Sequence, residues 1–497
     1  MTLLPPARLY IDGTLRDASG GATFDIVNPW TGEVAGVAAD ATHEDVDAAI
    51  AAARRAFDET DWGDPANRDN RLALLRKLRA LFEDNKDRLA QLARFEAGAA
   101  MGAVGMAHVD NANQGWDDYM AVFDQVTWEE DLGNRDFRGF PSHRKVVYEP
   151  VGVVAAITPW NVPHYVNVGK VVAALLAGCT VILKPAPDTP GMGAIWGELA
   201  EQAGLPKGVL NVVFGADPAA AGEQLVTDPR VDLISFTGST GVGKRIMQAG
   251  ADTLKRVFLE LGGKSAKIVL DDAPDFAREC AQSMLVFHAG QGCAVQSRLL
   301  VPRSRYEEAK AGLKMAYQGF GDNWGKIDEP THIMGPVVSQ RQMDRVMRYI
   351  ELGQEEGASL LAGGKARPDK TPEGGAGGYF IEPTCFVDVD NSMRIAQEEI
   401  FGPVLVVIPY EDDEDAIRIA NETQYGLSGG VVSADPARAE RVARRIRSGS
   451  MSVNGGMCIA GDLPFGGFKG SGMGREWGLA GIEEFLDSKV IATRLAS

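Results

Sequence analysis

Ser235-Phe-Thr-Gly-Ser-Thr-Gly-Val-Gly-Lys244 is a glycine-rich turn that follows a predicted strand and opens a predicted helix. Its glycines at 238, 241 and 243 let the backbone approach a diphosphate, and the N-terminus of a helix favours negative charge. The spacing differs from the common dinucleotide fingerprint, so the turn alone is weak evidence. Its place within a longer series of strands and helices favours phosphate binding.

Residues 151–262 alternate between short apolar runs and helical patterns. We expect strands at 151–158, 180–184, 209–214, 232–236 and 256–260, separated by helices at 163–176, 191–203, 219–226 and 243–249. Such alternation predicts an α/β fold with a parallel sheet and a binding crevice at the carboxyl ends of the strands. Lys184 ends one of these strands and could bond ribose hydroxyls there; the alternative is a solvated lysine.

The flanking regions predict further elements. A capping box at Thr42–Asp45 opens a helix over 43–59, and a longer helical region covers 67–97. After residue 263, a second α/β region is expected, with strands at 266–270, 297–301, 385–387 and 404–409 and helices at 306–319, 339–356, 413–421 and 435–448. Residues 126–150 and the C-terminal segment are strand-like, so they could pair with each other or with a partner subunit.

Length and composition limit the function classes. A chain of 497 residues suggests two or three domains, and its formal net charge of −18 argues against nucleic acid or an anionic membrane as a partner. Five scattered cysteines imply no disulfide framework and fit a reducing cytoplasm. We find no signal peptide, no apolar run long enough for a bilayer, and no histidine spacing typical of a metal site.

A cysteine follows a second glycine-rich turn, in Phe287-His-Ala-Gly-Gln-Gly-Cys293-Ala-Val-Gln-Ser-Arg298. Upstream, Leu259-Glu-Leu-Gly-Gly-Lys264 presents the carboxylate of Glu260 ahead of a glycine pair. A thiolate adds to carbonyl groups, and a carboxylate can activate the water that later releases an acyl group. Most cysteines are small buried apolar residues, but the turn before Cys293 suits a site built from backbone donors better than a packed helix.

Seven motifs, in order and spacing, resemble those of the aldehyde dehydrogenase superfamily over nearly the whole chain. They are Thr158-Pro-Trp-Asn-Val-Pro163, Lys184-Pro, Phe236-Thr-Gly-Ser-Thr240, Leu259-Glu-Leu-Gly-Gly-Lys264, Gly290-Gln-Gly-Cys293 with Arg298, Glu398-Glu-Ile-Phe-Gly-Pro403 and Pro464-Phe-Gly-Gly-Phe-Lys469. The resemblance implies a Rossmann-like dinucleotide-binding domain (1–125 and 151–260), an α/β catalytic domain (261–470) and a β oligomerisation arm (126–150 and 480–497). It also implies a homodimer or homotetramer.

The resemblance also implies roles for individual residues. Cys293 would be the nucleophile, Glu260 the general base, and Asn161 part of the oxyanion hole, with Lys170 and Glu476 in proton relay. Residues expected at the cofactor are Thr158, Pro159, Trp160, Lys184, Gly222, Gly238, Ser239, Leu261, Glu399 and Phe401. Members that transfer the acyl group to coenzyme A usually lack a carboxylate at the position of Glu260, so water is the expected acceptor.

Two departures from the family pattern concern Pro187 and His288. NAD-preferring members often carry a glutamate where this chain has Pro187, so NAD or NADP is possible. Asp188 beside it and the lack of a nearby arginine favour NAD. His288 stands where many members have asparagine, and the sequence offers no explanation.

A set of four residues that follows Asn161 indicates the class of substrate. Val162, Tyr165, Val166 and Gly169 share one face of the predicted helix, which in the family walls the aldehyde tunnel. Val162 and Gly169 replace bulky aromatics and should widen the tunnel, which is kept apolar by Phe287, Met457, Ile459 and Phe465. We therefore expect a bulky or long apolar aldehyde; helix packing is the structural alternative. A thiol esterase and a non-catalytic protein on the same fold are the competing functions.

Overall fold

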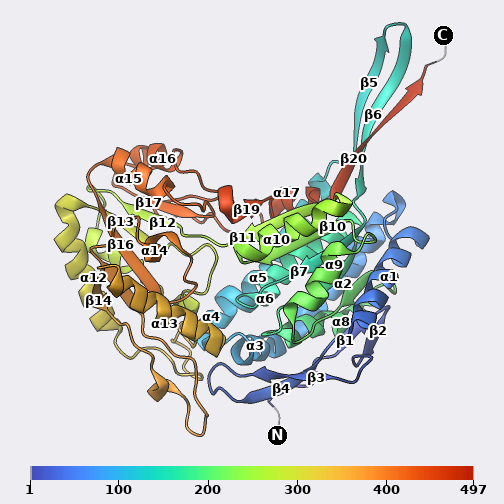
Figure 1. Cartoon of the computed structure of the whole chain (residues 1–497). Coiled ribbons are helices and arrows are strands. Elements are labelled where there is room, and N and C mark those ends of the chain that lie inside the picture. The colour runs from blue at the N-terminus through green and yellow to red at the C-terminus, as the bar shows by residue number, and fades with distance from the viewer. Residues whose placement is uncertain (1–2, 496–497) are drawn as a thin grey trace.

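The computed structural model of the protein describes residues 3–495. Residues 1, 2, 496 and 497, which the sequence analysis assigned to the first domain and to the arm, lie outside the described residues. Within the described range the strands form two large sheets, a three-stranded sheet and a two-stranded sheet. Figure 1 shows the two large sheets side by side and the three-stranded sheet projecting away from both.

The first large sheet has the strand order β19-β11-β10-β7-β8-β9-β1-β2. The strands are β1 (Leu9–Ile11), β2 (Thr14–Arg16), β7 (Val153–Ile157), β8 (Thr180–Lys184), β9 (Leu210–Val212), β10 (Leu233–Gly238), β11 (Arg256–Leu261) and β19 (Gly472–Met473). The strands from β7 to β11 pair in parallel, as the alternating pattern predicts. Parallel strands need crossover helices, and these cover both faces of the sheet.

The helices packed around this sheet include the predicted ones, with the region predicted over 67–97 divided into two helices, and two more within residues 101–122 that were not predicted. They are α1 (His43–Glu59), α2 (Arg68–Asp84), α3 (Lys86–Phe95), α4 (Met101–Ala103), α5 (Asp110–Val122), α8 (Pro190–Ala203), α9 (Pro218–Thr227) and α10 (Thr240–Gly250). The capping box before α1 forms: the Thr42 hydroxyl accepts from the Asp45 N–H, and the Asp45 carboxylate accepts from the Thr42 N–H. The small sheet of β3 (Thr23–Val27) and β4 (Val34–Ala39) packs on the same core.

The helix predicted over 163–176 is interrupted. It consists of α6 (Pro163–Asn167), a π-helical stretch over Val168–Val172 and α7 (Ala173–Ala177). A π-helical turn takes more residues than an α-helical turn, and such insertions are frequent at functional sites. The relation between Val162 and Gly169 is therefore not the ideal seven-residue repeat that the sequence analysis assumed.

The second large sheet has the order β14-β15-β16-β13-β12-β17-β18. Its strands are β12 (Ala266–Val269), β13 (Arg298–Pro302), β14 (Ser359–Ala362), β15 (Thr384–Val387), β16 (Val404–Tyr410), β17 (Gly429–Val432) and β18 (Ser452–Val453). Its helices are α11 (Phe276–Ala281), α12 (Tyr306–Phe320), α13 (Gln340–Glu355), α14 (Arg394–Gln397), α15 (Asp413–Asn421) and α16 (Pro436–Ala443). The sequence analysis missed β14, β17 and β18, which are short.

Arg298 ties the end of the cysteine loop into the second sheet. Its fully buried guanidinium donates to the backbone oxygens of Lys264, Ile419 and Ala420 and to the side chain of Asn391. A guanidinium can satisfy several acceptors at once in a fixed geometry. This arginine therefore fixes where the loop enters β13.

The projecting sheet consists of β5 (Glu129–Phe137), β6 (Phe140–Pro150) and β20 (Leu486–Arg494). The predicted pairing of the two segments with each other is found: β20 runs antiparallel to β6, from Leu486 opposite Pro150 to Arg494 opposite Ser142. Residues 478–483 form α17, a helix on the body of the molecule, so the described arm starts later than residue 480.

Two further properties of the described chain bear on the sequence analysis. Across residues 3–495, no helix is long and apolar enough to cross a membrane. All five cysteines are free thiols in this range, and three of them, Cys179, Cys280 and Cys385, are buried.

Candidate active site

The predicted site residues of the first sheet gather at the carboxyl ends of its strands. Thr158 follows β7, and its N–H donates to the backbone oxygen of Lys184, the last residue of β8, over 3.0 Å. Gly238 and Glu260 lie at the ends of the neighbouring strands β10 and β11. Because parallel strands end at the same edge, residues far apart in sequence meet along one crevice.

The cysteine loop begins with three consecutive residues in the left-handed region. His288 (φ 47°), Ala289 (φ 52°) and Gly290 (φ 68°) turn the chain sharply before Cys293. The loop also approaches the glycine pair after β11, since a Cβ on Gly263 would lie 2.6 Å from the backbone oxygen of Cys293. The half-buried Cys293 is therefore held close to the end of β11 by backbone contacts that tolerate no side chain at 263.

Glu260 and Cys293 perturb each other. Burial, and then the negative charge of Glu476, raises the pKa of Glu260 to about 8. Burial, and then the charge of Glu260, raises the pKa of the Cys293 thiol well above its ordinary value. The Oε1 atom of Glu260, which is 2% exposed, has no hydrogen-bond partner within residues 3–495. A buried carboxyl with a free oxygen beside a thiol can accept a proton from that thiol or from a water.

Asn161 reaches the cysteine loop from the first sheet. Its side-chain amide donates to the backbone oxygen of Gln291 over 3.0 Å, and the residue is 4% exposed. Gln291 is itself fixed, because its side chain donates to the backbone oxygen of His288 and accepts from the N–H of Val338. Asn161 is therefore held against a residue that lies two positions before Cys293. From this place its amide N–H can stabilise the oxyanion that develops when the thiol attacks a carbonyl group.

Lys170 and Glu476 form a buried ion pair. Their Nζ and Oε1 atoms are 2.5 Å apart, and Lys170 also donates to the hydroxyl of Ser235 over 3.1 Å. Both side chains are almost fully buried, and the charge of Glu476 is felt by Glu260 and by Cys293. The structure thus brings the five predicted catalytic residues, Cys293, Glu260, Asn161, Lys170 and Glu476, into one region.

The predicted diphosphate end lies at the start of α10. The Ser239 hydroxyl caps the helix by accepting from the N–H of Val242. A Cβ on Gly241 would meet no described atom within 4 Å, so the space in front of this helix end is open. Lys184 is 3% exposed, burial lowers its pKa to about 8, and a Cβ on Gly222 would lie 3.8 Å from its Cε atom. An open helix N-terminus is suited to a diphosphate, and a buried lysine at the same edge of the sheet is suited to a ribose.

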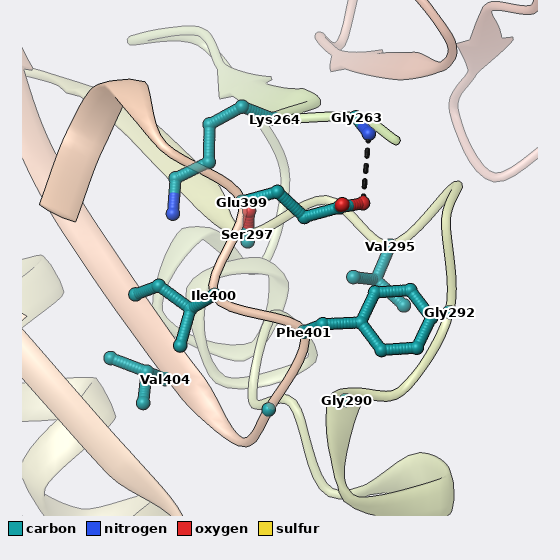
Figure 2. Close-up of a pocket in the computed structure, with 11 residues that line it drawn as sticks. Gly263, Lys264, Gly290, Gly292, Val295, Ser297, Glu399, Ile400, Phe401 and Val404 are labelled. Atoms are coloured by element: carbon teal, nitrogen blue, oxygen red, sulfur yellow. Dashed lines mark hydrogen bonds between the residues drawn. The ribbon is translucent and has the colours of Figure 1, made fainter. Parts of the chain in front are cut away.

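The other predicted end of the cofactor site involves Glu399 and Phe401. Glu399 accepts from the N–H of Gly263 over 2.9 Å (Figure 2), and burial raises its pKa to about 7. Phe401 (φ 61°) lies against Trp160, with ring centroids 5.3 Å apart and the planes nearly perpendicular. Glu399 and Phe401, which precede β16 of the second sheet, therefore contact Gly263 and Trp160, which follow strands of the first sheet. Pro159 lies directly before Trp160, and Leu261 ends β11.

Lys264 is a feature of this region to which the sequence analysis gave no role. Burial lowers its pKa to about 7, and its Nζ atom has no hydrogen-bond partner in the described chain. It lines a small cavity together with Glu399, Gly290 and Gly292 (Figure 2). Its place in the motif Leu259–Lys264 marks it in the sequence, but its burial depends on contacts with the second sheet.

The predicted tunnel residues differ in how far their side chains are exposed. Val162 and Ile459 are half-buried, Val166 and Phe465 are buried, and Phe287 (37% exposed) and Met457 (80% exposed) lie at the surface. The expectation that Gly169 widens the tunnel is wrong, because Trp477 takes the space: a Cβ on Gly169 would lie 3.1 Å from the Trp477 ring. The ring of Tyr165 packs at a tilt of 31° against the same indole, with ring centroids 4.4 Å apart.

The expectation of no arginine near Asp188 is also wrong. Burial raises the pKa of Asp188, and the charge of Arg341 on α13 opposes that rise. Arg341 comes from the second sheet, 153 positions away in sequence, so no local pattern could reveal it.

Comparisons with known proteins agree with the resemblance. A model described as the aldehyde dehydrogenase family matches residues 15–491. The chain belongs to the aldehyde dehydrogenase family. A 3-succinoylsemialdehyde-pyridine dehydrogenase from a Pseudomonas species is 40% identical over 492 residues, which cover 97% of each protein. The predicted family, fold class and enzyme class, an NAD(P)-dependent aldehyde dehydrogenase, are confirmed.

Solved structures of family members superpose closely. The Mycobacterium tuberculosis aldehyde dehydrogenase complexed with NAD+ has a TM-score of 0.90 at 40% identity, covering 98% of this chain and 97% of that one. Aldehyde dehydrogenase C of Pseudomonas syringae, solved as a cysteine-to-alanine mutant with NAD+ and octanal, has a TM-score of 0.88 at 37% identity, covering 97% and 96%.

No group of three or more histidine, cysteine, aspartate or glutamate side chains in the described part of this family member is arranged to hold a metal ion.

Proposed function

We propose that this chain oxidises an aldehyde to the carboxylic acid through a thioester on Cys293, with NAD as the cofactor. The observation that carries the proposal is the pairing of a buried, unsatisfied carboxyl, Glu260, with the thiol of Cys293 at the carboxyl edge of the first sheet. Neighbouring groups that shift each other's pKa in a cleft are typical of catalytic sites.

The chain's own groups supply most of the mechanism. The Cys293 thiol loses its proton, which Glu260 can accept, and the sulfur attacks the aldehyde carbon. The Asn161 amide and the N–H of Cys293 stabilise the oxyanion, at about 3–4 kcal/mol per donor. Loss of a hydride from the tetrahedral carbon, to the acceptor that the cofactor would supply, leaves a thioester on Cys293. Glu260 gives up the thiol proton towards the Lys170–Glu476 ion pair and then takes a proton from water, which attacks the thioester carbon. The carbon–sulfur bond breaks, the sulfur leaves as the thiolate, and the carboxylic acid is released.

NAD fits the residues present. Lys184 would hold the adenosine ribose, the α10 N-terminus with Trp160 and Ser239 the diphosphate, and Glu399 with Phe401 the nicotinamide end. When bound, the nicotinamide ring supplies the acceptor for the hydride. Related structures were solved with NAD+, which supports this choice. The glutamate missing at Pro187 removes one barrier to NADP, and the positive charge of Arg341 acts on the neighbouring Asp188.

An apolar aldehyde is the proposed substrate class. Val162, Val166, Ile459 and Phe465 offer apolar side chains beside the catalytic residues. The octanal bound to the Pseudomonas syringae relative supports a long apolar group, and the pyridine ring in the name of the Pseudomonas relative supports a bulky one.

We also propose the predicted division into a dinucleotide-binding domain, a catalytic domain and an oligomerisation arm, with the protein working as a homodimer or homotetramer. The exposed apolar side chains of the projecting sheet support assembly. The cytoplasmic location inferred from the unpaired cysteines stays a prediction.

The formation of reduced nicotinamide tests the proposal. Purified protein is mixed with acetaldehyde, octanal or benzaldehyde and with NAD or NADP, and Cys293→Ala is the control. We expect reduced cofactor with NAD and an apolar aldehyde, and none from Cys293→Ala. If no aldehyde yields reduced cofactor but an activated ester is hydrolysed in a Cys293-dependent way, the protein is a thiol esterase. If neither reaction occurs, the non-catalytic alternative holds.

A further inference from the structure

Trp477 occupies a slot between two glycines. A Cβ on Gly115 of α5 would lie 2.6 Å from its ring, and one on Gly169 would lie 3.1 Å from it. The indole stacks on the ring of Tyr119, with centroids 5.0 Å apart and planes at 19°, and packs at a tilt of 31° against the ring of Tyr165, with centroids 4.4 Å apart. Only 1% of Trp477 is exposed. The two glycines thus leave a space beside the rings of Tyr119 and Tyr165, and the indole of Trp477 fills that space.

The backbone of Trp477 is held in an unusual conformation. Its φ of 66° and ψ of 162° lie in a region that glycine adopts readily and other residues rarely do. Its N–H donates to the Tyr119 hydroxyl over 2.8 Å, and that hydroxyl donates to the backbone oxygen of Gly169 over 3.0 Å. Such a conformation persists only where its surroundings over-determine it, and it is frequent next to functional sites.

The residue before it is Glu476. Two backbone hydrogen bonds of 2.7 Å join Glu476 to Phe465, and its carboxylate pairs with Lys170 at 2.5 Å. The groups that sense its charge are Glu260 on β11, Cys293, Tyr119 on α5 and Tyr165 on α6. A shift of the Trp477 backbone would therefore move a carboxylate that acts on the catalytic base.

We propose that Trp477 is a positioning residue that fills the space left by Gly169 behind the aldehyde tunnel and fixes the Glu476 carboxylate on Lys170. In the family, the helix that follows Asn161 walls the tunnel with its own side chain at the position of Gly169. Here the wall at this position comes from Trp477, because Gly169 has no side chain and leaves room for the indole. This inference rests on the proposed function and adds a determinant of substrate size.

A double-mutant cycle tests the shared space. Gly169→Trp, Trp477→Ala and the swap Gly169→Trp/Trp477→Ala are compared for kcat/KM on acetaldehyde and on 4-isopropylbenzaldehyde. Gly169→Trp should lower kcat/KM on both aldehydes. Trp477→Ala should raise the ratio of kcat/KM on the bulky aldehyde to that on acetaldehyde by about tenfold. The kcat/KM of the swap should exceed the value expected from multiplying the two single effects by about tenfold. Multiplicative effects with an unchanged ratio would overturn the shared-space part of the proposal.

The pH profile of kcat tests the second part. The charge of Glu476 raises the pKa of Glu260, so displacing Glu476 should move the midpoint near pH 8 to lower pH. Trp477→Leu should show this shift, whereas Trp477→Phe, which keeps a stacked ring, should retain the wild-type midpoint. An unshifted midpoint in folded Trp477→Leu refutes the positioning role.

Trp324→Phe is the matched control, because Trp324 is equally buried and packs in the core of the second sheet. It should change neither the ratio nor the midpoint, and melting temperatures report folding of every variant. Should Trp477→Ala not fold, the Phe and Leu variants still decide the pH question, and Trp477→Leu replaces Trp477→Ala in both the single and the double variant of the cycle. A wild-type protein that oxidises no aldehyde would count against the proposed function, whereas an active wild type with insensitive variants would count only against Trp477.

Discussion

Glu260 keeps its proton at neutral pH because it is buried near another carboxylate, Glu476. With a pKa of about 8, roughly one tenth of the molecules carry the charged base at pH 7 and about nine tenths at pH 9. Turnover limited by thioester hydrolysis should therefore rise with pH through about 8. Glu260→Gln should lower kcat by about 10²–10⁴-fold and remove this rise.

Rapid mixing distinguishes this role from a general loss of structure. Glu260→Gln should still release about one equivalent of reduced cofactor per site in a burst, because acylation precedes the water step. Cys293→Ala should release none. A folded Glu260→Gln variant without a burst, yet with normal cofactor binding, would assign Glu260 to thiol activation alone.

Lys264 predicts a measurable effect on stability. Its pKa is lowered by burial from 10.5 to about 7, so the unfolded chain binds this proton more tightly than the folded chain does. The contribution of this group to stability is therefore complete above about pH 10.5 and is lost as the pH falls towards 7. Lys264→Met should melt at or above the wild-type temperature at pH 7 and should show a weaker fall between pH 10 and 7.

Thermal melts at several pH values check this expectation, with Lys267→Met as the control. Lys267 is a neighbouring lysine that donates to Glu279, so its removal should cost stability at all these pH values. A Lys264→Met variant that melts well below wild type at pH 7 would indicate that the ammonium has a compensating partner.

For single residues, the sequence predicted which side chains carry the chemistry but not which distant residues pack against them. Cys293 and Glu260 could be predicted because a thiol after a glycine turn and a carboxylate before a glycine pair are readable locally. The residue that fills the space beside Gly169 could not be predicted, because it is Trp477, which lies 308 positions away in the sequence. The same holds for Arg341 near Asp188.

Among the elements, the turn before Cys293 makes the sharpest prediction. Gly290 has a φ of 68°, and a Cβ there would lie 2.4 Å from the backbone oxygen of Gly402. Gly290→Ala should therefore displace the loop, lower kcat/KM by at least about tenfold and destabilise the protein by about 1–3 kcal/mol. Kinetics and chemical denaturation measure the two effects.

Gly292→Ala is the matched comparison within the same loop. Its Cβ would lie 3.0 Å from a methyl group of Val295, which can rotate away, and its φ is not in the left-handed region. It should be the milder variant in both assays. Equal losses for the two variants would mean that loop mobility, and not the left-handed turn, controls Cys293.

Element types and order were largely predictable, whereas local deviations were not. Helix α1 and strand β8 have the predicted bounds because periodicity and caps are local signals. The π-helical stretch at Val168–Val172 and the left-handed His288 and Ala289 leave no such signal. Both deviations lie where the site is built, where packing between distant segments overrides local preference.

In the whole molecule, the projecting sheet exposes apolar side chains that its own chain leaves uncovered. Phe137 (60% exposed) and Phe140 (67%) face each other at the tip of the β5–β6 hairpin, and Val490 (68%) lies on β20. Figure 1 shows the outer end of this sheet extending away from the rest of the chain. Exposed apolar side chains clustered on one element mark an interaction surface, and a second copy of this chain is the partner that the proposed assembly supplies.

Phe137→Ser/Phe140→Ser and, separately, Val490→Asp should therefore yield a smaller species than wild type in light scattering across a range of concentrations. The body should stay folded, because these side chains contact neither large sheet, so the far-ultraviolet spectrum should be retained. Met315→Ser is the control: Met315 is 66% exposed but lies on α12, away from the projecting sheet. If the arm variants keep the wild-type mass while Met315→Ser lowers it, assembly runs through the second sheet instead, and the arm has another task.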